Sequence, residues 1–153
     1  MSKADDDTLG QISTGPRETK LQAATERWRL PRGAVIVLQQ SGGLRFSTRA
    51  VLVYRDGRVF FRRQGKLGVG EDTRRITSDE VAELIELIKQ SGLFELPRSI
   101  GQPSPDGYAY ELIARVGRKS QALEFFDGSI PVEVKPLLKR LKLLFSEQKT
   151  SPV

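Results

Sequence analysis

The sequence predicts one α+β domain in which an antiparallel sheet of four to five strands carries two amphipathic helices on one face. Three observations predict this fold class: a hairpin signal in the first half, a capped helix after it, and a leucine-rich helical stripe near the C-terminus. The expected order of elements is β-β-β-α-β-β-α. We expect an N-terminal extension with a short helix over residues 1–31, the domain over residues 32–146, and a frayed tail over residues 147–153.

The first half of the domain indicates three strands. Residues 34–38 are uniformly apolar, which is typical of a strand buried on both faces, and Ser41-Gly42-Gly43 then interrupts it. Residues 49–55 alternate between two faces. The dipeptide Asp56-Gly57 follows directly and predicts a tight hairpin turn to a partner strand over residues 58–63.

Two helices are predicted from caps and apolar periodicity. Thr77 and Glu80 have the spacing of a capping box, apolar residues follow at helical spacing, and Gly92 supplies the stop. This helix holds most of the acidic side chains of residues 77–111. A second hairpin is expected over residues 108–126. The last helix carries one apolar stripe, formed by Val134, Leu137, Leu138, Leu141, Leu144 and Phe145.

The residue types that the chain lacks restrict its chemistry. Without His and Cys it has no usual general base, no thiol nucleophile and no soft metal ligand. A Ser-His-Asp or Cys-His arrangement cannot be built, while carboxylate chemistry stays open. We therefore expect a protein that is not an enzyme, with no catalytic residues, no metal, no cofactor and no small-molecule substrate.

The chain also lacks the signals of a membrane protein. No apolar run approaches the roughly 20 residues that span a bilayer, and the acidic start of the sequence has no apolar core of the kind found in secretory signals. The absence of cysteine fits a reducing compartment. These observations predict a cytoplasmic protein without a membrane span.

The net charge of +6 is unevenly distributed, because residues 32–76 hold ten basic and three acidic side chains. Within them lies a candidate basic patch on the first hairpin, formed by Arg49, Arg55, Arg58, Arg62 and Arg63. Interleaved with Tyr54, Phe60 and Phe61, such a patch suits phosphates, and exposed aromatic rings suit stacking on bases. Alternation turns Tyr54 and one phenylalanine toward the core, so a plain solvated basic face is the competing interpretation.

Two loops and one helical segment are candidate protein-binding sites, because preorganised projecting segments lose little entropy on binding. The candidates in the first loop are Ser41, Gly42, Gly43, Leu44 and Arg45, and those in the Pro-rich second loop are Pro105 and Asp106. Trp28 belongs to a helical pattern over residues 20–30 that either rests on the domain or binds a partner. Each loop taken alone is equally consistent with an ordinary connection.

Several segments resemble a known family in their order and spacing. They are Ser41-Gly42-Gly43, the Ser91–Pro97 helix exit, Pro105–Leu112, the Asp127–Pro131 turn and Pro136-Leu137-Leu138. Over roughly residues 35–145 they resemble the emfourin-like family of small bacterial proteins, whose namesake inhibits protealysin, a thermolysin-type zinc metalloprotease. The chain departs from this pattern at Ser120-Gln121, where a His is common, in its long N-terminal extension and in its more basic hairpin.

The resemblance implies a shared α+β fold and, as a special case of protein binding, inhibition of a thermolysin-type metalloprotease. Composition and resemblance together predict a non-catalytic protein-binding module whose partner is another protein. The alternative is an accessory subunit of a larger protein or ribonucleoprotein complex. Such a subunit would dock through the N-terminal extension or, with nucleic acid as the partner, through the basic hairpin.

Overall fold

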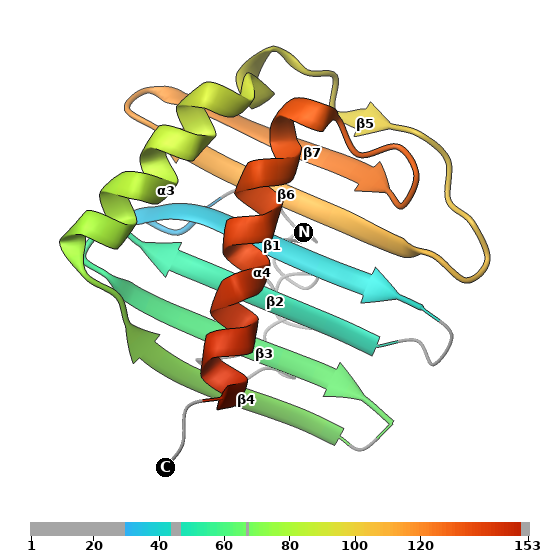
Figure 1. Ribbon diagram of the computed structural model, residues 1–153, viewed down its shortest axis with the longest axis horizontal. Coiled ribbons are helices and arrows are strands. Elements are labelled where there is room, and N and C mark those ends of the chain that lie inside the picture. The colour runs from blue at the N-terminus through green and yellow to red at the C-terminus, as the bar shows by residue number, and fades with distance from the viewer. Residues whose placement is uncertain (1–29, 44–46, 67, 151–153) are drawn as a thin grey trace, which may run out of the picture.

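A computed structural model describes residues 30–43, 47–66 and 68–150, with only the backbone described for residues 146–150. Within these ranges the chain forms a seven-stranded sheet with two α-helices across one face (Figure 1). The strand order is β4-β3-β2-β1-β6-β7-β5. Neighbouring strands are antiparallel, except that β5 pairs with β7 in parallel.

The bounds of the elements follow the chain. The strands are β1 (Ala34–Gly42), β2 (Ser47–Tyr54), β3 (Arg58–Gly65), β4 (Gly68–Arg75), β5 (Ser99–Ile100), β6 (Tyr108–Val116) and β7 (Lys119–Phe126). The helices are α3 (Ser78–Ser91) and α4 (Lys135–Thr150), each accompanied by a short 3₁₀ turn, η1 (Leu93–Glu95) and η2 (Val132–Val134). Helix α4 continues past residue 146, where the domain was expected to end.

The α+β class and the two helices on one face are confirmed, but the predicted four to five strands and the order β-β-β-α-β-β-α are wrong. The described chain has seven strands in the order β-β-β-β-α-β-β-β-α. The prediction missed β4 because its glycines and charged residues show no apolar alternation and nearly all of them are exposed. It missed β5 because two residues carry no periodicity.

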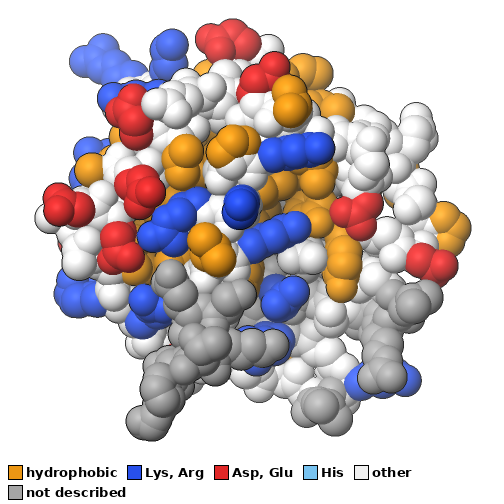
Figure 2. All heavy atoms as spheres, in the orientation of Figure 1, with side chains coloured by type: hydrophobic (Ala, Val, Ile, Leu, Met, Phe, Trp, Pro, Cys, Tyr) orange, Lys and Arg blue, Asp and Glu red, His pale blue; other side chains and the backbone are white. Residues whose placement is uncertain are grey.

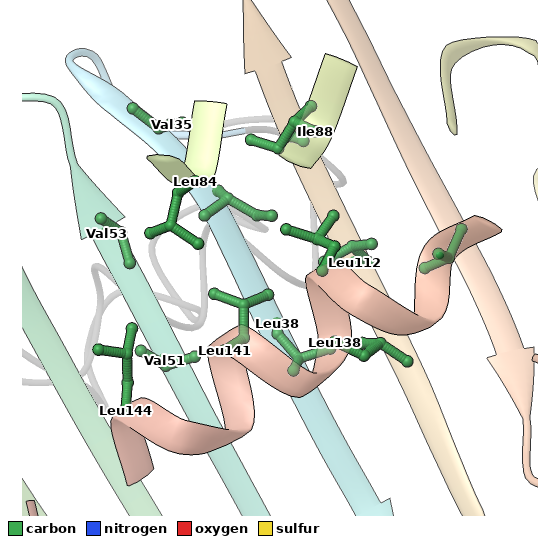
Figure 3. Packing of buried hydrophobic residues seen from close by; sticks show 14 of the residues in the cluster. Val35, Leu38, Val51, Val53, Leu84, Ile88, Leu112, Leu138, Leu141 and Leu144 are labelled. Atoms are coloured by element: carbon green, nitrogen blue, oxygen red, sulfur yellow. The ribbon is translucent and has the colours of Figure 1, made fainter. Parts of the chain in front are cut away.

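The main core lies between the helices and the sheet. Figure 3 shows Leu84 and Ile88 of α3 and Leu141 of α4 pointing toward Leu38 and Leu112 on the strands. Each of these side chains is almost completely buried. Burying one leucine contributes about 1.5–3 kcal/mol relative to its exposed state, so this layer is the main source of stability.

Helix α3 begins at a polar cap, and the two helices meet through polar contacts. Thr77 and Glu80 form the predicted capping box, in which the N–H of Glu80 donates to Thr77 Oγ1 at 3.1 Å and the N–H of Thr77 donates to Glu80 Oε1 at 2.8 Å. Gly92 ends α3 with a φ of 69°, as predicted. The Arg140 guanidinium of α4 forms salt bridges with Glu80 at 3.3 Å and with Glu83 at 3.5 Å, and these connect the two helices.

A second apolar cluster covers the opposite face of the sheet. It contains Leu30, Ala34, Val37, Ala50, Leu52, Tyr54, Ile113 and Ala122, with Phe60 packed against it. Tyr54 and Phe60 meet edge to face, with ring centroids 5.6 Å apart, while Phe61 belongs to the main core. The inward position predicted for Tyr54 is therefore correct. Both phenylalanines pack against apolar clusters, one on each face.

Candidate functional site

The two predicted binding loops meet at one end of the sheet. Strands β1 and β6 are neighbours, and their pairing places Gly42 opposite Tyr108. Just beyond this pair, the N–H of Gly43 donates a hydrogen bond to the carbonyl oxygen of Gly107 at 3.2 Å. The segment Ser41-Gly42-Gly43 therefore lies beside the loop that carries Pro105 and Asp106, at the end of the sheet toward which β1 runs (Figure 1).

The close approach of the loops depends on glycine. Gly42 has a φ of +117° and Gly43 a φ of +83°, backbone conformations that side chains with a Cβ rarely adopt. A Cβ at Gly42 would lie 2.5 Å from the carbonyl oxygen of Gly107, and one at Gly43 would lie 3.0 Å from the Tyr108 ring. The paired glycines noted in the sequence thus permit a contact between loops as well as a turn.

Asp127 anchors the second loop. Its Oδ2 accepts a hydrogen bond from the N–H of Tyr108 at 2.8 Å, and its Oδ1 accepts one from the Tyr110 hydroxyl at 3.1 Å. The N–H of Asp127 donates to the carbonyl oxygen of Tyr108 at 3.1 Å. The sequence predicts only a turn at Asp127. Its position before Gly128, directly after a strand, signals a turn but not this contact with β6.

Tyr110 links this anchor to helix α4. Lys142 Nζ lies 3.3 Å from the Tyr110 hydroxyl and 5.0 Å from the centroid of its ring. Burial raises the pKa of Tyr110 above its ordinary value, and the Asp127 carboxylate and its hydrogen bond act in the same direction. The hydroxyl therefore stays neutral at physiological pH. It donates to Asp127 and accepts from Lys142.

A row of polar side chains extends from Tyr110 across the sheet beside α4. Gln40 lies opposite Tyr110 on one side and opposite Arg49 on the other. Gln40 is 5% exposed, and its Oε1 has no hydrogen-bond partner among the described residues. The Arg49 guanidinium lies 5.2 Å from the centroid of the Phe145 ring. Gln40 and Tyr110 are buried, so the row contributes to the surface only the positive charge of the partly exposed Arg49.

The arginines of the first hairpin do not form one patch. Arg49 and Arg63 lie opposite each other on the face that carries the helices. Arg58 lies 4.2 Å above the Tyr54 ring on the other face, which Arg62 shares because strand side chains alternate. Arg55 follows β2 and binds Gly33 through its backbone N–H. The remaining predicted site residues, Trp28, Leu44 and Arg45, lie outside the described residues.

Charge separates along the helix-bearing face. Figure 2 shows acidic side chains over α3 and basic side chains over α4. Within residues 30–43, 47–66 and 68–150, no group of three or more acidic residues is arranged to hold a metal ion. The helices described here include none with both the length and the apolar character needed to cross a bilayer.

The arrangement at the joined loops suits recognition. Asp127, the carboxylate that anchors the second loop, accepts hydrogen bonds from the Tyr108 N–H and the Tyr110 hydroxyl, and Tyr110 is held neutral. The backbone of residues 41–43 and the exposed side chains of Pro105 and Asp106 stay accessible around it. Comparisons with protein-family models and with curated protein sequences give no match for this chain.

Proposed function

We propose that this protein acts by binding another protein and does not catalyse a reaction. The binding surface is the joined-loop site, defined as residues 41–43, residues 104–108 and the partly exposed Arg49 beside them. The observation that carries the proposal is the hydrogen bond of Gly43 to Gly107, together with the bond that Tyr108 N–H donates to Asp127. These contacts hold two projecting segments in one conformation before a partner arrives, which lowers the entropy cost of binding.

The side chains of the site resemble those that contribute most to protein interfaces. Tyr108 is partly exposed and lies 6.5 Å from Tyr110 between ring centroids, so its ring is held in place by a buried neighbour. Tyrosine and arginine are enriched among the residues that dominate binding energy. Pro103 and Pro105 restrict the backbone of the second loop. A partner would therefore meet a rigid aromatic and polar surface.

The chemistry of the site indicates the kind of segment it would take. Arg49 and Lys142 are positive, and both side chains are partly exposed. A partner segment with a carboxylate fits these groups, because opposite charges across an interface favour association and specificity. By family resemblance, the special case is an inhibitor of a thermolysin-type metalloprotease.

The alternative, an accessory subunit of a larger complex, has two proposed docking sites. The first site is the basic hairpin, as a surface for nucleic acid. Its arginines lie on both faces of the sheet, so they do not form one continuous phosphate-binding surface, and the support for this site is weaker. Docking through residues 1–29 does not depend on the joined-loop site. Deleting those residues therefore separates the alternative from the main proposal.

Protease inhibition is tested by titrating a thermolysin-type metalloprotease with the purified full-length chain. We expect activity to fall in proportion to added protein and to be lost near one equivalent. Gly42→Ala, which places a Cβ against the Gly107 carbonyl, should raise the inhibition constant at least tenfold. Gly117→Ala is the matched control, because Gly117 also has a positive φ, of 62°, but lies in the β6–β7 turn with nothing within 4 Å of the added Cβ.

The outcomes separate the versions of the proposal. Full protease activity at a large molar excess would remove the inhibitor version. Affinity capture from native lysate, compared among wild type, Gly42→Ala and a chain starting at residue 30, then tests protein binding in general. Loss of a partner only in Gly42→Ala supports the joined-loop site, whereas loss only in the shortened chain supports the alternative. Substrate turnover abolished by replacing one carboxylate would contradict a non-catalytic role.

A further inference from the structure

We propose that the protein forms a two-fold symmetric dimer in which β4 pairs antiparallel with β4 of a second copy, centred on Thr73. Strand β4 is the last strand at one edge of the sheet in the described part of the chain. Its sequence places two acidic residues, a threonine and two basic residues in succession, from Glu71 to Arg75. This surface is separate from the joined-loop site, so it goes beyond the function proposed above.

The backbone shows which groups of β4 point to the open edge. The N–H of Ile76 donates to the carbonyl oxygen of Gly57 at 2.9 Å, so Ile76 bonds toward β3. Because bonding direction alternates along an antiparallel strand, Asp72 and Arg74 also bond toward β3. Residues Glu71, Thr73 and Arg75 then present their N–H and C=O groups outward. The N–H of Thr73 is consistent with this, because it does not bond to β3 and donates instead to the Asp72 carboxylate at 2.8 Å. In the dimer this bond would be replaced by one to the Thr73 carbonyl oxygen of the second copy.

These outward groups restrict how two copies can pair. A two-fold axis at the Thr73 pair sets Glu71 opposite Arg75 and Asp72 opposite Arg74 of the second copy, on the two faces of the sheet. Opposite charges directly across an antiparallel pair are stabilising, as are paired threonines. Moving the axis by one residue in either direction places Asp72 against Asp72 or Arg74 against Arg74. The charge pattern therefore selects the register centred on Thr73.

The pattern differs from the usual protection of a sheet edge. Edge strands often avoid pairing through like charges, lysines in particular, which repel a second copy in every register. Here both signs occur in an order that is complementary to itself under a two-fold rotation, which is the requirement of a symmetric interface. Glu71, Asp72 and Arg74 also interact within their own chain. Backbone hydrogen bonds therefore carry the association, and the charges fix its register.

Complementary charge reversal tests the register. We expect sedimentation velocity at low salt to show a concentration-dependent dimer of the full-length chain, weakened at high salt. The double variants E71R/D72R and R74E/R75E should each be monomeric, because each gives the strand a single sign of charge. An equimolar mixture of the two should recover the dimer, because every pair is then opposite in charge. Failure of the mixture to recover it would contradict the proposed register.

A proline substitution tests the backbone pairing without breaking the sheet. Thr73→Pro removes an N–H that points away from β3, a position where edge strands tolerate proline. It should therefore retain the far-ultraviolet circular dichroism of the wild type and lose the dimer. Thr73→Ala is the matched control and should retain both. A dimer that survives Thr73→Pro would place the interface elsewhere.

Cross-linking gives an independent measurement, because the chain has no cysteine of its own. At the proposed axis the two Thr73 Cα atoms would lie about 5.5 Å apart, within disulfide range. Thr73→Cys should form a covalent dimer under mild oxidation. Val69→Cys is the exposed control on the same strand, and its two copies would lie about 27 Å apart in this register. A monomer at all concentrations, or equal cross-linking of both variants, would overturn the proposal.

Discussion

The N–H of Gly43 donates a hydrogen bond to the carbonyl oxygen of Gly107, joining two loops that are far apart in the sequence. The contact follows from the pairing of β1 with β6, which places the end of one strand beside the start of the other. Glycine at positions 42 and 43 makes the approach sterically feasible. The joined-loop site thus depends on backbone geometry at least as much as on side chains.

Gly42→Ala should destabilise the fold by about 1–3 kcal/mol, because it combines a strained positive φ with a Cβ 2.5 Å from the Gly107 carbonyl oxygen. Urea unfolding followed by circular dichroism measures this loss. Gly117→Ala, which has a positive φ and no close neighbour, should cost less. Equal losses would mean that strain in φ, and not the contact between loops, accounts for the effect.

Asp127 and Tyr110 should be energetically coupled. Asp127→Asn weakens two hydrogen bonds, to the Tyr108 N–H and the Tyr110 hydroxyl, whereas Tyr110→Phe removes only the second. We expect the double variant to lose less stability than the sum of the single variants, by about 0.5–3 kcal/mol, as found for residues in one network. The measurement is a double-mutant cycle in chemical denaturation. Additive losses would show that the two groups act independently.

Glu111 should make stability depend on pH. Burial raises the pKa of its carboxyl above the ordinary 4.5, and Glu124, directly opposite on β7, raises it further. A carboxyl whose pKa is raised on folding stabilises the folded state at pH values below its unfolded-state pKa. This contribution is lost as pH rises through the folded-state pKa. Glu111→Gln should therefore raise the melting temperature at pH 7 and have little effect near pH 4.

The control for this experiment is Glu86→Gln, an exposed carboxylate on α3. It should leave the melting temperature nearly unchanged at both pH values. A gain for Glu111→Gln that is the same at pH 4 and pH 7 would contradict the electrostatic explanation. It would point instead to better packing of the neutral side chain.

The contribution of the α3 capping box to folding stability should be measurable by itself. Thr77→Ala removes the acceptor for the Glu80 N–H and should cost about 0.5–2 kcal/mol. Thr77→Ser retains the hydroxyl and should cost little. Because the Thr77 N–H lowers the pKa of Glu80, the stability that this bond contributes is lost as pH falls through the folded-state value. A loss in Thr77→Ala that is matched by Thr77→Ser would rule out the cap as its cause.

Local signals in the sequence determined most of the secondary structure. The Asp56-Gly57 turn, the capping box at Thr77 and the stop at Gly92 each depend on a few neighbouring residues, and the structure has all three. The apolar stripe of the last helix faces the core for the same reason, since its periodicity is a property of one element. Strand β4 was not predicted, because it pairs with β3 through backbone groups and its mostly exposed side chains show no apolar alternation.

The tertiary structure alone decided which distant segments meet. Nothing local to Gly43 or Gly107 specifies that β1 lies beside β6, because that pairing follows from how the whole sheet covers two apolar clusters. The same is true of the hydrogen bond between Asp127 and the Tyr108 N–H and of Lys142 over the Tyr110 ring. Residue types and local periodicity are encoded along the chain, whereas the order of strands reflects a balance of burial over all of it.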